Sequence, residues 1–281
     1  MRDARRVAGL ALAVSAVCAA RAPAQTSEQP NLIFTISAGY LTGGNLWNIS
    51  RQLAFVANNG SGNLWDTVAL GRKLRPGFAA TLTATYFRSP HFGYSLEAGF
   101  FGIESESECV PLAPFTPSTD NENQQACSYL QGQNQRGAAV GFLAGIMWRL
   151  STRGAQPYIR VAGGGAILGS SYVESAAQVI TSGLPGATVF FLADQNHKEL
   201  TWMLSLGAGA MLPLAPGYQL RIEARDLIVP LPRPTGPATD TAAVAAGSEL
   251  PQPPVGFKVM HIPTITVGLD VVLERRRGRR Y

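Results

Sequence analysis

Beyond residue 24 the sequence lacks any continuous apolar run long enough to cross a membrane as a helix. This absence excludes a helical inner-membrane protein. The sequence also has only three histidines and three cysteines, and no histidine lies near the second or third cysteine. Because the spacing of these two cysteines matches no common zinc pattern, we assign no residue to a metal or a cofactor.

The central part of the chain also lacks an excess of positive charge, although the whole chain carries +5. Residues 1–24 contribute a net +3 and the five arginines of residues 275–281 contribute +5, which leaves −3 for residues 25–274. We therefore expect no nucleic-acid partner. The Arg-rich tail, residues 275–281, is interpreted as a solvated terminus, with an anionic partner or lipid headgroups as the alternative.

The first residues have the order of a secretory signal: charged residues, then an apolar run from Val7 to Ala20, then Ala22-Pro23-Ala24. We expect cleavage after residue 24, so that residues 1–24 are a signal peptide and residues 25–274 form one β domain. A lipoprotein signal with a lipidated Cys18 is the alternative. In an exported protein, the remaining pair Cys109 and Cys127 predicts a disulfide that closes a polar, Pro-rich loop.

Eight segments alternate apolar side chains with small or polar ones, which is the pattern of transmembrane β-strands. In the clearest segment, Leu220 and Ile222 would face lipid while Arg221 and Glu223 would face the interior. The segments are Leu32–Tyr40, Phe78–Tyr86, Tyr94–Phe100, Ala138–Arg149, Tyr158–Leu168, Thr201–Ala210, Tyr218–Arg225 and Thr264–Leu273.

The connections between these segments alternate strictly in length. Short turns are expected at 89–91, 151–156 and 213–217, and long polar connections at 42–76, 104–135, 169–199 and 230–259. Tight periplasmic turns and long outside loops are typical of an outer-membrane barrel, and an even number of strands places both termini in the periplasm.

Aromatic residues at the strand ends agree with this orientation. The expected periplasmic girdle comprises Tyr86, Tyr94, Trp148, Tyr158 and Tyr218, and the sparser outer girdle comprises Tyr40, Phe78, Phe100 and Trp202. The predicted fold is therefore all-β, an antiparallel eight-stranded up-and-down transmembrane β-barrel. A soluble lipocalin-like barrel is the alternative fold.

The eight segments, Pro157-Tyr158-Ile159-Arg160-Val161, the Gly-Ala-Gly of residues 207–209 and the last strand together resemble small outer-membrane β-barrel proteins of the OmpA and OmpX type. The resemblance implies a bacterial outer-membrane location, with outer-membrane lipid and the barrel-assembly machinery as partners. It also implies an assembly signal on the last strand, which Thr266, Gly268, Val271 and Leu273 fit. The chain departs from the family by continuing through its Arg-rich tail to Tyr281.

Charged residues of both signs fall on the polar faces of the strands and are expected inside the barrel, where buried charges must be paired or hydrated. The expected lumenal network consists of Glu97, Arg149, Arg160, Arg221, Glu223, Arg225 and Asp270. Such side chains would fill an eight-stranded barrel and leave little room for a channel.

Three functions stay open at the level of sequence. A structural or surface-interaction barrel with an unknown external ligand is favoured over a narrow pore or small-solute transporter. A lipid-acting hydrolase would need a nucleophile activated by a nearby base, in practice a serine or aspartate beside a histidine near the outer rim. His197 and His261, with Ser170, Ser171 and Glu199, are the only residues so placed, and they match no family motif, so no catalytic residue is assigned.

Overall fold

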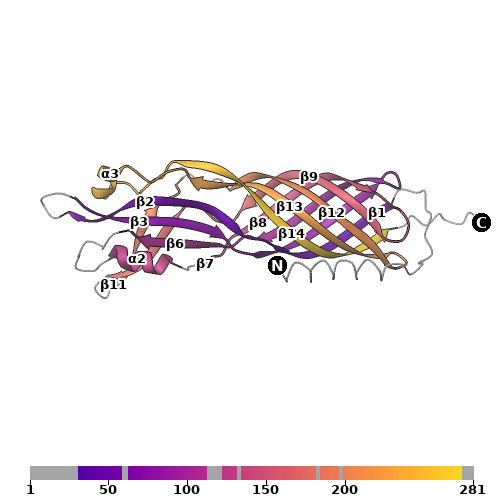
Figure 1. The fold of residues 1–281 in the computed structure, drawn as a ribbon, viewed down its shortest axis with the longest axis horizontal. Coiled ribbons are helices and arrows are strands. Elements are labelled where there is room, and N and C mark those ends of the chain that lie inside the picture. Colours follow the sequence, from indigo (N-terminus) through magenta and orange to yellow (C-terminus); the bar gives the residue numbers. More distant parts are fainter. Residues whose placement is uncertain are drawn as a thin grey trace, which may run out of the picture.

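A computed structural model describes residues 31–58, 63–112, 122–131, 134–181, 184–195 and 199–273. Eight antiparallel strands close into a barrel in the order β1-β14-β13-β12-β9-β8-β5-β4 (Figure 1). Neighbours in the barrel are neighbours in the chain, and β1 closes the circle by pairing with β14. The predicted eight-stranded up-and-down barrel is confirmed, and with it the fold that the resemblance to small outer-membrane barrels implies.

The barrel strands are β1 (Asn31–Leu41), β4 (Gly77–Phe87), β5 (Phe92–Gly102), β8 (Ala138–Arg149), β9 (Gln156–Leu168), β12 (Leu200–Ala215), β13 (Tyr218–Pro234) and β14 (Val255–Leu273). Buried and exposed residues alternate along them, because successive side chains of a strand take opposite faces. On β13, Arg221 and Glu223 are buried inside whereas Ile222 is exposed outside. Apolar side chains such as Ile36, Leu82 and Phe142 cover the outer face of the barrel.

One tyrosine departs from its expected place. Tyr158 is buried, and its hydroxyl donates a hydrogen bond to Glu223 inside the barrel. Tyr158, Arg160 and Ala162 occupy alternate positions of β9, and all three side chains point into the barrel. Tyr158 therefore does not belong to the aromatic girdle on the outer face. Tyr86, Tyr94, Trp148 and Tyr218 are exposed on the outer face, as expected of a girdle.

One end of the barrel, called the turn end below, is closed by three short connections, at 88–91, 150–155 and 216–217. The first two agree with the expected turns, whereas β12 continues to Ala215 and shortens the third. Gly154 and Gly217 have φ values of 62° and 83°, a left-handed conformation that glycine adopts without strain. Leu32 of β1 pairs with Leu273 of β14, so both described ends of the barrel chain lie at this turn end.

At the opposite end the four long connections fold into a second layer, which we call the cap (Figure 1). Its elements are β2 (Gly44–Asn58), β3 (Asn63–Leu74), β6 (Ser105–Pro111), α2 (Glu122–Leu130), β7 (Asn134–Gln135), β10 (Ser175–Thr181), β11 (Leu184–Leu192), α3 (Thr241–Ala245) and the parts of β13 and β14 that rise beyond the barrel. These connections were expected to be polar loops. Instead they contain the four-stranded sheet β2-β3-β6-β7 and the hairpin β10-β11.

The cap has an apolar core of its own, continuous with the apolar residues at the adjacent end of the barrel. Trp47 and Leu70 of the β2-β3 hairpin are buried in it, together with Tyr172 and Phe191 of the third connection and Leu231 of β13. Burial of such side chains contributes roughly 1.5–3 kcal/mol each. The cap is therefore stabilised in the same way as a small globular domain.

Within the described residues, no helix is both long and apolar enough to span a membrane. Residues 1–30 and 274–281, which contain the expected signal peptide and Arg-rich tail, lie outside the description.

Candidate functional site

The predicted lumenal charges meet in two groups inside the barrel. In the first group, Glu97 accepts hydrogen bonds from Arg160 at 2.6 Å and from Arg225 at 2.8 Å. Glu223 lies 3.6 Å from Arg160 and accepts the hydroxyl hydrogen of Tyr158 at 2.6 Å. All five side chains are buried, and each carboxylate has a charged or hydroxyl partner, which is what buried charges require.

The second group lies toward the turn end. Arg221 Nε donates to Asp270 Oδ1 at 2.9 Å, and Thr35 donates to the same oxygen at 2.7 Å. Arg149 is also buried, and its guanidinium carbon lies 3.3 Å from the centre of the Phe87 ring. All seven predicted lumenal residues are thus inside the barrel, six of them in ion pairs and Arg149 on an aromatic face.

Apolar side chains close the lumen on both sides of these charges. Toward the turn end, a separate buried cluster is formed by Ile33, Phe87, Met147, Tyr158 and Met211. Toward the cap, Phe101, Leu143 and Met203 are buried and belong to the core that continues into the cap. Side chains therefore fill the barrel from end to end, as its small strand number predicts.

In the cap, the β2-β3 hairpin holds each of the later connections through a buried polar side chain. Gln52 of β2 reaches the last connection: its Oε1 accepts from Ala238 N at 2.9 Å, and its Nε2 lies 3.5 Å from Ala238 O. Gln52 is fully enclosed. The side-chain amide of Gln52 thus contacts both the N–H and the C=O of Ala238, as the backbone of a neighbouring strand would, and it holds the last connection against β2.

Arg72 of β3 holds the third connection. Its guanidinium donates to Ser171 O at 3.2 Å, to Glu174 O and to the Ser107 hydroxyl. Burial lowers the pKa of Arg72 to about 10, although Glu174 counteracts the shift. Beside it, Trp47 Nε1 donates to Tyr172 O at 2.7 Å.

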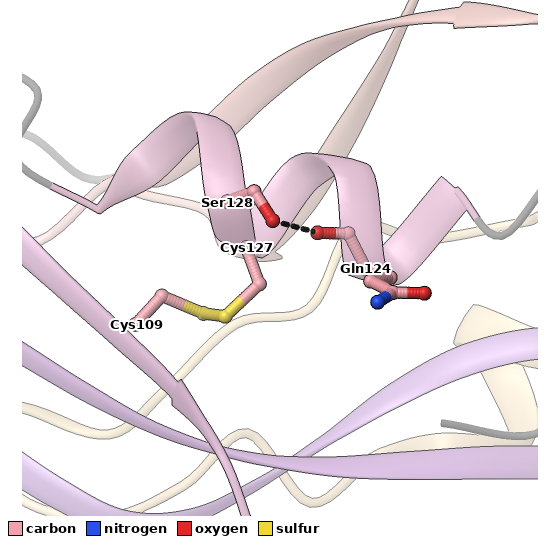
Figure 2. Close-up of a disulfide and its surroundings, with 4 residues drawn as sticks. All are labelled: Cys109, Gln124, Cys127 and Ser128. Atoms are coloured by element: carbon pink, nitrogen blue, oxygen red, sulfur yellow. Dashed lines mark hydrogen bonds between the residues drawn. A yellow bond between two sulfur atoms is a disulfide. The ribbon is translucent and has the colours of Figure 1, made fainter. Parts of the chain in front are cut away.

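The second connection is held by a disulfide and by an asparagine. Cys109 of β6 and Cys127 of α2 are joined by a disulfide (Figure 2), as the sequence predicts. In the same helix, Asn123 Nδ2 donates to Phe55 O at 2.9 Å and lies 3.3 Å from Asp66 Oδ2. The helix is thereby fixed to both β6 and the β2-β3 hairpin.

One described histidine, His261, has a carboxylate beside it of the kind that the lipid-acting hydrolase would need, whereas His91 and Ser171 have other partners. His91 Nδ1 lies 2.9 Å from Arg149 O at the turn end. His261 Nδ1 lies 2.6 Å from Asp226 Oδ2 on the outer face of the barrel. The Ser171 hydroxyl donates to Asp194 and accepts from two backbone amides of its own loop. His197 lies outside the described residues.

The residues matched to the assembly signal lie on β14. Thr266 and Gly268 face the interior, Val271 is half-buried and Leu273 is exposed. Their recognition by an assembly machinery stays a prediction. Among the described residues, no group of three or more histidines, cysteines or carboxylates could hold a metal ion.

Sequence reasoning missed the polar residues that hold the cap together. Gln52, Arg72 and Asn123 lie in segments that were interpreted as loops, and none belongs to a known motif. The available signal was the alternation of Val68, Leu70 and Arg72 in β3, where an arginine occupies the buried phase of the strand.

No protein-family model and no curated protein matches the sequence. Several solved structures are similar in fold at low identity. Neisserial surface protein A is 9% identical with a TM-score of 0.40, over 87% of this chain and 99% of that one. Ail, the attachment invasion locus protein of Yersinia pestis, solved with a heparin analogue, is 12% identical with a TM-score of 0.31, over 86% and 99%. The outer membrane protease OmpT from Escherichia coli is 9% identical with a TM-score of 0.37, over 86% and 97%. Because these values are low, the function proposed below rests on the geometry of this chain.

Proposed function

We propose that this chain is a bacterial outer-membrane protein whose barrel anchors the cap outside the cell, where the cap serves as a binding surface. The observation that carries the proposal is the asymmetry of the two barrel ends. One end has three short turns, whereas the other carries a folded layer with its own core, a disulfide and buried polar contacts. A narrow pore, a small-solute transporter and a lipid-acting enzyme are the alternative functions.

Two features support a membrane location for the barrel. Its outer face is apolar at Ile36, Leu82, Leu96 and Phe142, whereas its interior carries the ion pairs. A soluble barrel has the opposite arrangement, with bulky apolar residues inside and polar residues facing water. The lumen favours a binding surface over a pore or transporter, because buried apolar side chains lie on both sides of its charged groups.

Cysteine labelling on whole cells tests the orientation. Ser248→Cys places a thiol on the exposed surface of the cap, and Arg153→Cys places one at the exposed turn end. A membrane-impermeant maleimide should label Ser248→Cys on intact cells and Arg153→Cys only after the outer membrane is opened. The reverse pattern would invert the orientation. Recovery of the protein in the soluble fraction would instead support the lipocalin-like alternative.

A further inference from the structure

The upper part of β14 has a paired strand on only one side. β14 pairs with β13 from Val255 to Val271, but with β1 only from Thr264 to Leu273. The last link toward β1 is a hydrogen bond from Thr42 N to Pro263 O, at 3.0 Å. Beyond it the chain of β1 continues into β2, which pairs with β3 in a different sheet. In the described part of the chain, no strand pairs with this side of β14 from Val255 to Pro263.

The register shows which residues present their backbone to this open side. In an antiparallel strand, the N–H and C=O of one residue point to the same side, and alternate residues share a side. Since Pro263 O accepts from Thr42, residue 263 faces the open side. The β13-β14 ladder has no register shift, so His261, Val259, Phe257 and Val255 face it too. We call these four residues the upper β14 edge.

The other edge of the same two-stranded ribbon is blocked. Pro230, Pro232 and Pro234 of β13 pair with Val259, Phe257 and Val255. Pro230 O accepts a hydrogen bond from the Thr201 hydroxyl at 3.1 Å, so residue 230 points away from β14. Alternation places all three prolines on that edge. Because proline has no N–H, such an edge cannot accept a further regular strand.

The side chains at the open edge are apolar and exposed. Val255, Phe257 and Val259 are 48%, 54% and 49% exposed. His261 and Asp226 lie between these three residues and the apolar face of the barrel. A carboxylate and an imidazole mark a level outside the hydrocarbon of a bilayer, because ionisable groups are costly inside it. Contact with lipid tails therefore does not explain the three exposed apolar side chains beyond that level.

We propose that the upper β14 edge binds an extended polypeptide segment of an extracellular partner, which adds to the sheet as a strand. Backbone amides at Phe257, Val259 and His261 would pair with the segment, and its alternate apolar side chains would pack on Val255, Phe257 and Val259. Donors and acceptors that repeat at every second residue, about 6.6–6.8 Å apart, match a polypeptide backbone. This inference rests on the proposed function, because the partner reaches the edge only if the cap lies outside the cell.

Amide hydrogen exchange on the full-length protein in lipid nanodiscs tests the inference. The probe is an end-blocked seven-residue peptide in which valine and threonine alternate. In the free protein, the amides of Phe257, Val259 and His261 should exchange rapidly, and the peptide should slow them at least tenfold. Gly256, Lys258 and Met260 face β13, so their amides serve as internal controls and should be protected with or without peptide.

Two variants of one residue separate backbone pairing from apolar contact. Val259→Pro removes an N–H that the β13-β14 ladder does not use, and it should weaken peptide binding at least tenfold. Val259→Thr keeps this N–H and a β-branched side chain and should bind within about threefold of wild type. The gel shift between heated and unheated samples verifies that both variants fold.

Three results would overturn the inference: edge amides already protected without peptide, edge amides unaffected by the peptide, or unchanged binding by Val259→Pro. None of these depends on where the cap lies in the cell, so each is distinguishable from a failure of the maleimide test. If the cap is labelled on intact cells and the edge amides are protected in the free protein, only the inference about the edge is wrong.

Discussion

At the scale of single residues, the position of a side chain along a strand decides what an added charge costs. Ile36 is the most exposed large apolar residue of β1 and lies midway between Leu32, which pairs with Tyr86, and Tyr40, which pairs with Phe78. Ile36→Arg should lower the free energy of unfolding in liposomes by about 2–4 kcal/mol. Tyr40→Arg, the same change near the outer girdle, should cost only about 0–1 kcal/mol. Equal costs in urea titrations would argue against a membrane-embedded barrel.

Adjacent residues in β3 provide a second comparison at this scale. Arg72 is fully buried with three oxygen partners, whereas Lys73 makes an exposed pair with Glu108. Arg72→Met should leave the carbonyls of Ser171 and Glu174 without donors, at a cost of about 1–3 kcal/mol each. The third connection should then be cleaved faster by a protease added to the folded protein. Lys73→Met should leave the cleavage rate unchanged; equal rates in the two variants would show that Arg72 does not hold this connection.

At the scale of elements, the disulfide should matter to α2 and not to the barrel. Cys109 and Cys127 are 18 positions apart, and a crosslink of that span stabilises by about 3 kcal/mol in chain-entropy terms. The double variant Cys109→Ser with Cys127→Ser should expose α2 to proteolysis while the heat-dependent gel shift of the barrel persists. Ser128→Ala, a nearby exposed change in the same helix, is the control. Loss of the gel shift in the double variant would mean that barrel and cap fold as one unit.

A comparison of individual strands and helices shows how much of the structure could be predicted from the sequence. The barrel strands were predictable because lipid on one side and a filled lumen on the other impose a strict alternation, as in Leu220 to Arg225. β2 was not predictable, because register shifts after Asn45, Ile49 and Phe55 break the two-residue period. Its buried residues also include Gln52, a polar side chain whose partner lies far away in the chain. The disulfide was predictable from an even pair of cysteines in one polar stretch of an exported chain, but the helix that it holds was not.

At the scale of the whole molecule, the side chains in the lumen predict that the protein does not conduct ions. The ion pairs of Glu97 and Asp270 lie between apolar clusters at both ends of the barrel. In planar bilayers, wild-type protein should give no stable conductance steps above the background of empty membranes. Steps that appear reproducibly, and that change in Phe87→Ala within the turn-end cluster, would favour the pore alternative.

The contact between Gln52 and Ala238 also sets the order in which the molecule can be completed. The two residues are 186 positions apart, and Thr35 and Asp270, across the seam between β1 and β14, are 235 apart. Contacts between residues so far apart in the sequence form late, because the intervening chain must first lose conformational entropy. The apolar core around the β2-β3 hairpin is therefore completed only after the last connection has folded onto it. The cap is therefore complete only when the whole chain has been made and its barrel closed, so truncated or half-assembled copies would not display the proposed binding surface.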